Sequence, residues 1–341
     1  MEVSNKKRKQ TKYLEKAERF QVLKNIYQFQ SLLKVDPFRL NYHLNKPIYF
    51  SFKVPKKKGG FRIIQSPNEE LKEIQRKLNF YLQSLYLSYK PKSVHGFVFN
   101  PNGIEAAHTI VSNARPHCNK KHVLNMDMED FFPSISAKRI KDSLSQEPFN
   151  LKDEVSTITA LIGSFEKKLP TGAPTSPVLS NIVCYKLDLN IEEYCFNKNI
   201  KYTRYADDLS FSSDNVFTNK IINELKKIIT DYGFALNDKK FRLLSSKSKQ
   251  VVTGLVVNQK PNVDRKYIRR LRAILYSWET MGVELAAAKH YQLTDLNSVD
   301  VSKFVRKLIG QIEFVGQVRG NSDSIYKKFK DQLKANLDLD A

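Results

Sequence analysis

The sequence predicts an α+β fold in which short strands that carry acidic residues alternate with longer helical segments. Residues 201–212 form two short runs around a turn, which is typical of two strands joined by a tight turn. Residues 123–127, Val-Leu-Asn-Met-Asp, are an apolar strand that ends in a carboxylate. Residues 68–90 and 265–275 instead repeat their apolar side chains at helical spacing.

The same periodicities predict the other elements along the chain. A helix is expected to open at Ser176, with Pro177 in its first turn. The expected helices are 21–45 (as short pieces), 68–90, 151–165, 176–187, 218–232, 265–275 and 304–318. The remaining expected strands are 251–257 and a hairpin, 49–54 with 61–64, that has a cationic tip at 55–60.

Two adjacent aspartates, Asp207 and Asp208, lie at the turn of the strand pair. Leu209 and Phe211 alternate with serines, so we expect the second strand to bury one face and expose the other to water. Two carboxylates about 4 Å apart repel by on the order of 4 kcal/mol at an effective dielectric of 20. A Mg²⁺ ion would convert that repulsion into binding, although Asp-Asp is also a common turn dipeptide.

A second acidic strand end makes the metal interpretation stronger. Asp127 follows an apolar strand, and Glu129 and Asp130 come directly after it. One carboxylate from each of two adjacent strands could hold two metal ions about 3.5–4 Å apart, the arrangement used for in-line phosphoryl transfer.

The bulk composition indicates a globular protein with a polyanionic partner. The 341 residues suffice for two or three packed subdomains. The net charge of +22 favours nucleic acid as the partner, with an anionic membrane surface as the alternative. No run of about 18 apolar residues predicts a membrane span, and no apolar run after the basic N-terminus predicts a signal peptide. The odd count of cysteines, Cys118, Cys184 and Cys195, favours a reduced, cytoplasmic protein.

Several ordered motifs resemble those of reverse transcriptases. Tyr205-Ala206-Asp207-Asp208 is similar to their YxDD box, and residues 124–127 with Phe131-Phe132 resemble their first catalytic motif. Residues 169–177, Leu-Pro-Thr-Gly-Ala-Pro-Thr-Ser-Pro, resemble the LPQGAPTSP box. Asn113-Ala114-Arg115-Pro116-His117 and Val252-Thr253-Gly254 resemble the NAxxH and VTG signatures of the bacterial retron branch. The resemblance covers about residues 46–320.

This resemblance implies a right-hand polymerase fold with fingers, a palm built on an antiparallel sheet, and a helical thumb. The implied parts are a basic N-terminal helical extension (1–45), fingers (46–122 with part of 140–180), a palm (123–257) and a thumb (258–341). It also implies an RNA-directed DNA polymerase that uses a structured non-coding RNA (msr-msd) as template and primer. The product would be branched RNA–DNA (msDNA), made from dNTPs with two Mg²⁺ ions, in anti-phage defence with a separate effector protein.

The resemblance also assigns site residues. Asp127, Asp207 and Asp208 would be catalytic metal ligands, with the carbonyl of Met128 as an additional ligand. Thr171 stands where most relatives have Gln, which puts a nucleotide contact there in doubt, and Phe132 would be a steric gate against ribonucleotides. The nucleotide-binding residues would be Lys53, Arg62, Asp130, Phe132, Thr171, Gly172 and Lys240. The nucleic-acid-binding residues would be Asn113, His117, Val252, Thr253, Gly254, Arg265, Arg269 and Arg272.

Other interpretations remain open for individual residues and for the whole chain. The lysines near 53–58 suit a protected edge hairpin. Phe132 suits the core and Lys240 the surface, while Asn113 and His117 suit a structural role. The chain as a whole could be an RNA- or msDNA-binding scaffold that holds an effector. A group II intron maturase is less favoured, because the segment after the expected thumb is short. The sequence does not indicate the oligomeric state.

Overall fold

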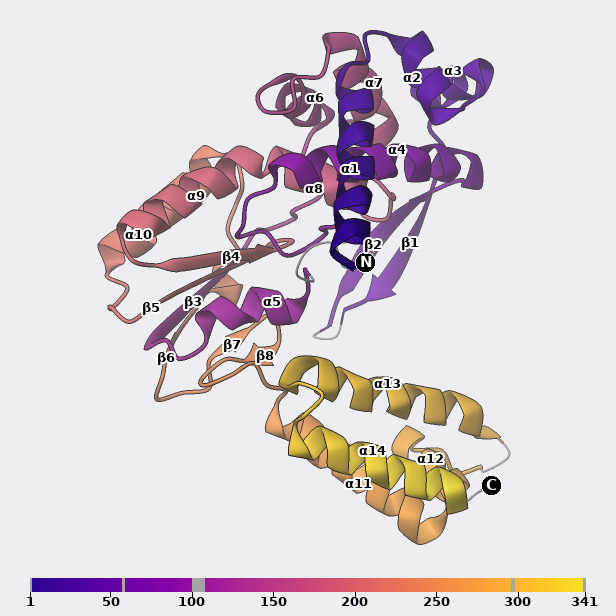
Figure 1. Cartoon of the computed structure of the whole chain (residues 1–341), viewed down its shortest axis with the longest axis vertical. Coiled ribbons are helices and arrows are strands. Elements are labelled where there is room, and N and C mark those ends of the chain that lie inside the picture. The colour runs from indigo at the N-terminus through magenta and orange to yellow at the C-terminus, as the bar shows by residue number, and fades with distance from the viewer. Residues whose placement is uncertain (1, 57–58, 100–107, 296–297, 340–341) are drawn as a thin grey trace. The chain divides into compact units, whose positions relative to one another are not determined.

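The structure is a computed structural model that describes residues 2–56, 59–99, 108–295 and 298–339 (Figure 1). It divides into two compact units. The first comprises Met1–Asn113 and His122–Leu243, and the second comprises Ala114–Lys121 and Leu244–Ala341. Part of the predicted hairpin tip, residues 57–58, lies outside the described residues. The division does not separate fingers from palm, so the four-part organisation expected from the sequence stays a prediction.

Helices form most of the chain before residue 232, interrupted by short strands. The helices are α1 (Glu2–Gln21), α2 (Ile26–Leu33), α3 (Pro37–Asn45), α4 (Glu69–Tyr89), α5 (Ile110–Ala114), α6 (Ala137–Ser145), α7 (Asp153–Gly163), α8 (Ser176–Val183), α9 (Tyr185–Asn197) and α10 (Asn219–Asp231). The strands are β1 (Tyr49–Pro55), β2 (Phe61–Pro67), β3 (His122–Asp127), β4 (Lys201–Tyr205), β5 (Asp208–Ser213) and β6 (Arg242–Ser245).

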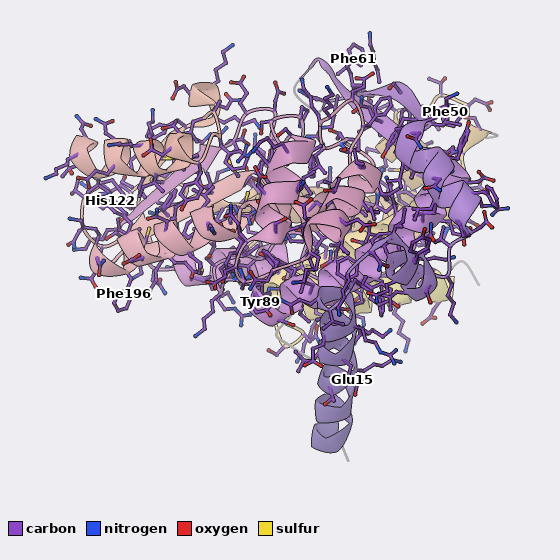
Figure 2. All side chains as sticks on the ribbon, turned by 90° about the horizontal axis from the view of Figure 1, so that it is seen from above. Glu15, Phe50, Phe61, Tyr89, His122 and Phe196 are labelled. Atoms are coloured by element: carbon purple, nitrogen blue, oxygen red, sulfur yellow. The ribbon has the colours of Figure 1, made fainter. Side chains whose placement is uncertain are left out.

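One hydrophobic core runs through the first unit. Phe20 of α1 and Leu78 of α4 belong to the same buried cluster as Leu209 and Phe211 of β5 and Phe234 after α10. Figure 2 shows α1 projecting from the other helices, with Glu15 on the projecting part. The N-terminal helices, the long helix α4 and the central strands are therefore stabilised together by apolar burial.

The strands that carry the aspartates lie in a four-stranded sheet of order β4-β5-β3-β6, with β5 antiparallel to both of its neighbours. One face of β5 carries Leu209, Phe211 and Ser213, and the other carries Asp208, Ser210 and Ser212, while α9 packs against the neighbouring strand β4. The prediction that this second face is exposed to water was wrong, because Ser210 and Ser212 are buried. The C-terminal end of α5 lies against this face, where the Thr203 hydroxyl on β4 donates to the Asn113 carbonyl at 3.2 Å.

The predicted hairpin is confirmed as β1 and β2, but its two cationic candidates point apart. Lys53 pairs with Ile63, whereas Arg62 pairs with Val54. Because neighbouring residues of a strand alternate between faces, Lys53 and Arg62 lie on opposite faces of the ribbon. Phe50 and Phe61, labelled in Figure 2, are 62% and 63% exposed on these two faces.

Two predicted elements differ in detail. The helix expected over 176–187 is broken at Cys184, whose ψ of −4° departs from helical geometry, so that α8 ends and α9 begins there. The strand expected over 251–257 is a two-stranded hairpin, β7 (Val251–Val252) with β8 (Leu255–Val256). Thr253 and Gly254 both have positive φ (45° and 83°), the pattern of a type I′ hairpin turn.

The second unit is mainly a bundle of four helices, of which two were expected, over 265–275 and 304–318. They are α11 (Arg265–Met281), α12 (Val283–Tyr291), α13 (Val301–Arg319) and α14 (Ser324–Leu339). Trp278 and Phe304 are buried between them. Gly316 permits a close approach, since a Cβ there would lie 2.7 Å from the Tyr326 ring. Among the described helices, none has a stretch long and apolar enough to cross a bilayer.

Candidate active site

The sheet register brings the two acidic strand ends together. Asp127 is the last residue of β3 and pairs directly with Asp208, the first residue of β5. Directly opposite residues share one face of a sheet, so both carboxylates belong to the polar face. One step deeper on that face, the Ser210 hydroxyl bonds the Asn125 side chain at 3.0 Å. The predicted meeting of Asp127 with the Asp-Asp pair is thus present in the structure.

Asp207 lies in the tight turn that joins β4 to β5. Tyr205 pairs with Asp208, so Ala206 and Asp207 form a two-residue loop. Ala206 has φ of 59°, a left-handed conformation that costs energy in a residue with a Cβ. The backbone N–H of Met128 donates to the Asp207 carbonyl at 3.1 Å, which ties the turn to β3. The role of the Met128 carbonyl as a metal ligand stays a prediction.

Lys240 supplies a cation at Asp127. Its Nζ donates to both carboxylate oxygens, at 2.7 and 2.8 Å. The backbone places it there, because the N–H of Asn237 donates to the Asp127 carbonyl at 2.8 Å and a 3₁₀ turn over Asp238–Lys240 follows. Lys240 is thus a surface lysine that is also bonded to the site, and its role in nucleotide binding stays a prediction. Lys240 is exposed, but its ammonium lies on the buried carboxylate.

The three carboxylates disturb one another's ionisation. Desolvation, followed by the charges of Asp207 and Asp127, raises the pKa of Asp208 to about 7. Desolvation and the charge of Asp127 also raise the pKa of Asp207. Desolvation lowers the pKa of the Lys240 ammonium, but the hydrogen bond to Asp127 and the charges of the neighbouring carboxylates raise that pKa by more. The site thus holds an excess of negative charge that one ammonium does not neutralise.

The residues fit a divalent cation, although they do not yet form a cage. No three His, Cys, Asp or Glu side chains within the described ranges are arranged to hold a metal ion as they stand. The Lys240 ammonium bonds to both oxygens of Asp127, where a metal ion would otherwise bind. Carboxylates crowded enough to raise the pKa of Asp208 are hard oxygen donors of the kind Mg²⁺ prefers. Asp127, Asp207 and Asp208 would hold the ion, with Lys240 displaced from Asp127.

The predicted nucleotide-binding residues are only partly brought together. Arg62 lies near enough to Asp207 for its charge to oppose the rise in that residue's pKa. Lys53 lies on the opposite face of the hairpin. Asp130 is exposed in a left-handed conformation (φ 43°), three residues after the end of β3. Phe132 is half-buried and packs against the core, with its ring 5.4 Å from Phe131 and 5.8 Å from Phe97, and its role as a steric gate stays a prediction.

Thr171 and Gly172 join the β1–β2 hairpin to the rest of the first unit. The Thr171 carbonyl accepts from the backbone N–H of Gln65 on β2, at 2.9 Å. Gly172 has φ of 141°, and a Cβ there would lie 2.8 Å from the Gln65 carbonyl oxygen. Glycine is therefore required at this position for the backbone of β2 to approach. A nucleotide contact by the Thr171 side chain stays a prediction.

The two retron-like signatures are mostly interior. Asn113 and His117 are fully buried, as is Val252 on β7. Burial favours the structural interpretation of Asn113 and His117 over direct contact with RNA. Thr253 and Gly254 form the β7–β8 turn, where Gly254 is exposed. A nucleic-acid contact by this signature is thus restricted to the turn.

A basic cavity lies within the second unit. It has a volume of about 970 Å³ and lies between the loop after β6 and the N-terminal part of α11. Arg265 and Arg269 line it, and Arg272 lines a smaller neighbouring cavity of about 270 Å³, while their binding of nucleic acid stays a prediction. Asp264, the acid in its lining, pairs with Lys249 at 2.6 Å. The cations that sequence reasoning missed here are Lys247, Lys249, Lys260, Lys266 and Arg319.

The chain is similar to a well-defined family. A family model described as reverse transcriptase (RNA-dependent DNA polymerase) matches residues 54–266. The retron Ec86 reverse transcriptase of Escherichia coli is 32% identical over 265 residues, covering 75% of this chain and 78% of that protein. The retron Mx65 reverse transcriptase of Myxococcus xanthus is 32% identical over 246 residues, and the match covers 67% of this chain and 55% of that protein.

Among solved structures, a telomerase from Candida albicans in complex with a fragment of telomeric RNA matches with a TM-score of 0.48 and 11% identity. The match covers 91% of this chain and 68% of that one.

Proposed function

The chain belongs to the reverse transcriptases, as an RNA-directed DNA polymerase of a retron, and we propose that Asp127, Asp207 and Asp208 form its catalytic centre. The observation that carries this proposal is the direct pairing of Asp127 with Asp208 beside the turn that holds Asp207. All three residues fall within the span matched by the family model.

The reaction depends on a divalent metal, and two Mg²⁺ ions are part of the proposal. When bound, they supply Lewis acidity for the attacking hydroxyl, a 3′-OH or an RNA 2′-OH at initiation, and for the leaving pyrophosphate. Asp127, Asp207 and Asp208 would hold these ions at one edge of the sheet. Lys240, released from Asp127, could donate a proton to the pyrophosphate.

Other residues would position the incoming dNTP and the RNA. The Arg62 guanidinium can donate two hydrogen bonds to phosphate oxygens, and its charge acts on Asp207. Phe132 would border the sugar of the dNTP. Asp130 in the same motif, and Thr171 and Gly172 in the LPTGAPTSP segment, would also contact the nucleotide. In the second unit, the basic cavity with Arg265, Arg269 and Arg272 suits a phosphate backbone.

The wider setting is proposed from the relatives named as retron enzymes. The template and primer would be a structured non-coding RNA (msr-msd), and the product branched RNA–DNA. We propose a cytoplasmic enzyme that works with a separate effector protein in anti-phage defence. Co-purification from the host tests this: branched DNA with an associated protein supports it, whereas RNA alone favours a scaffold that only holds RNA.

Substitution of the turn aspartates tests the catalytic centre. Asp207→Asn and Asp208→Asn should each abolish cDNA synthesis on the cognate RNA while leaving RNA binding intact. Retained synthesis would refute the assignment. Glu193→Gln, an exposed change of the same kind on α9, is the matched control and should keep full activity.

A further inference from the structure

Arg204 on β4 has the largest side chain that is fully buried in the described part of the chain. It points away from the polar face, toward α9, where it pairs with an equally buried Asp188. The guanidinium Nε donates to Oδ1 at 2.7 Å and Nη2 donates to Oδ2 at 2.6 Å. A buried ion pair of this kind is weak evidence for stability, because desolvation offsets much of its attraction. Its position therefore calls for another explanation.

The remaining nitrogen of Arg204 reaches the catalytic turn. Nη1 donates to the carbonyl of Ala206 at 3.0 Å and to Oδ1 of Asn181 at 3.1 Å. The Asn181 amide in turn donates to the carbonyl of Gly96 at 3.0 Å. Gly96 lies directly on the turn, since a Cβ there would lie 2.4 Å from the Ala206 nitrogen. Ala206 is thus clamped in its left-handed conformation from two sides.

The peptide group after Asp207 is held as well. Its carbonyl accepts from the Met128 N–H on β3, at 3.1 Å. The carbonyls of Ala206 and Asp207 are therefore both fixed, one through Arg204 and one through the neighbouring strand. A backbone fixed before and after Asp207 sets the direction in which the Asp207 and Asp208 side chains leave the turn.

We propose that Arg204 is a positioning residue of the polymerase site. It holds the Ala206 carbonyl, and so aims the Asp207 and Asp208 carboxylates at a divalent metal. The inference rests on the proposed catalytic centre. It differs from a purely structural role of the ion pair, in which loss of Arg204 would lower stability without changing how the folded protein binds metal.

Arg204→Lys separates the two roles. Lysine keeps a charge for Asp188 but lacks the fork that reaches Ala206 and Asn181 together. Gln75→Met is the matched control, because Gln75 is also fully buried and donates to Tyr49 Oη at 2.7 Å and to the Ile162 carbonyl at 2.8 Å, away from the turn. Both variants should lower the melting temperature.

The deciding measurement is Mn²⁺ affinity, from the free-ion signal in electron paramagnetic resonance, together with kcat and the dNTP KM. Arg204→Lys should weaken Mn²⁺ binding by about 10-fold or more, as loss of outer-shell partners does. Its kcat should fall with little change in KM. Gln75→Met should bind Mn²⁺ like the wild type. Equal Mn²⁺ affinity in the two variants would overturn the proposal.

Two further proteins keep the test decisive. If Arg204→Lys does not fold, Asn181→Ala leaves the Arg204–Asp188 pair intact and should weaken Mn²⁺ binding in the same direction by a smaller factor. An unchanged affinity there would equally overturn the proposal. Asp208→Asn should lose the Mn²⁺ site. If the wild type and Asp208→Asn bind Mn²⁺ alike, the catalytic assignment fails, and that result is distinct from failure of the Arg204 inference alone.

Discussion

Lys53 and Arg62 lie on opposite faces of the β1–β2 hairpin, because Lys53 pairs with Ile63 while Arg62 pairs with Val54. The charge of Arg62 acts on Asp207. A two-stranded ribbon presents one face to a ligand at a time, so these two cations cannot both bind one triphosphate from the same face.

Arg62→Gln should therefore raise the KM for dNTP by about 10-fold or more, the worth of a charge-assisted hydrogen bond. Lys53→Gln, the same kind of change on the other face, should leave that KM nearly unchanged. Steady-state incorporation on the cognate RNA measures both. Equal effects of the two substitutions would show that the hairpin binds the triphosphate in another way.

The ionisation of Asp208 should make stability depend on pH. Its pKa is raised to about 7, so the folded state binds the proton more tightly than the unfolded state. The stabilisation from that proton is present at acid pH and is lost as the pH rises through about 7. Asp208→Asn should therefore raise the melting temperature at pH 8 in the presence of a chelator, and much less at pH 5.

Thermal unfolding followed by circular dichroism checks this difference. Glu193→Gln removes an exposed carboxylate in the same unit and should shift the melting temperature equally at both pH values. A stabilisation by Asp208→Asn that is identical at pH 5 and pH 8 would contradict the raised pKa.

Gly172 should tolerate no side chain. A Cβ would meet the Gln65 carbonyl oxygen at 2.8 Å and the Ile64 side chain at 2.9 Å, and φ is 141°. Gly172→Ala should cost about 1–3 kcal/mol of stability and push β2 away from Thr171, which raises the dNTP KM. Gly59→Ala is the control, because Gly59 also has positive φ (88°) but open space around it. If both variants change KM alike, the close approach at Gly172 is unimportant.

The basic cavity should contribute to the salt dependence of RNA binding. Arg265→Gln with Arg269→Gln should flatten the log–log slope of affinity against salt by about 0.7–0.9 for each phosphate that the protein no longer neutralises. Filter binding across a series of salt concentrations measures the slope. Lys334→Gln, an exposed change on α14 outside the cavity lining, should leave it unchanged. A slope that is unaffected by the double change would place the RNA elsewhere.

Local periodicity predicted the elements that carry Asp127, Asp207 and Asp208. Alternation along 201–212 and the apolar run before Asp127 give strand ends directly, and the register then brings them together. The same reasoning failed for Ser210 and Ser212, which are buried. Thr203, which pairs with Ser210, bonds to the end of α5, a helix distant in the sequence. What covers a strand is decided by tertiary packing, which alternation within the strand does not report.

Side chains that bond to each other across long stretches of sequence were either assigned from the family resemblance alone or not predicted. Lys240 was assigned to the nucleotide site from its motif, but its bond to Asp127 joins residues 113 positions apart in the sequence. Arg204 and Asp188 were not singled out. A signal existed, since Arg204 alternates with Thr203 and shares a strand face with Tyr202, and Asp188 interrupts the apolar side of α9.

Phe20 and Phe234 lie in the same hydrophobic cluster, although nearly the whole first unit separates them in the sequence. During synthesis on a ribosome, the ring of Phe20 on α1 can already be covered by Phe29 and by Tyr81 of α4, whereas the part of the cluster around Phe234 is completed later. Chimaeras that graft the front of this enzyme onto a relative will need matched residues at both ends of that cluster.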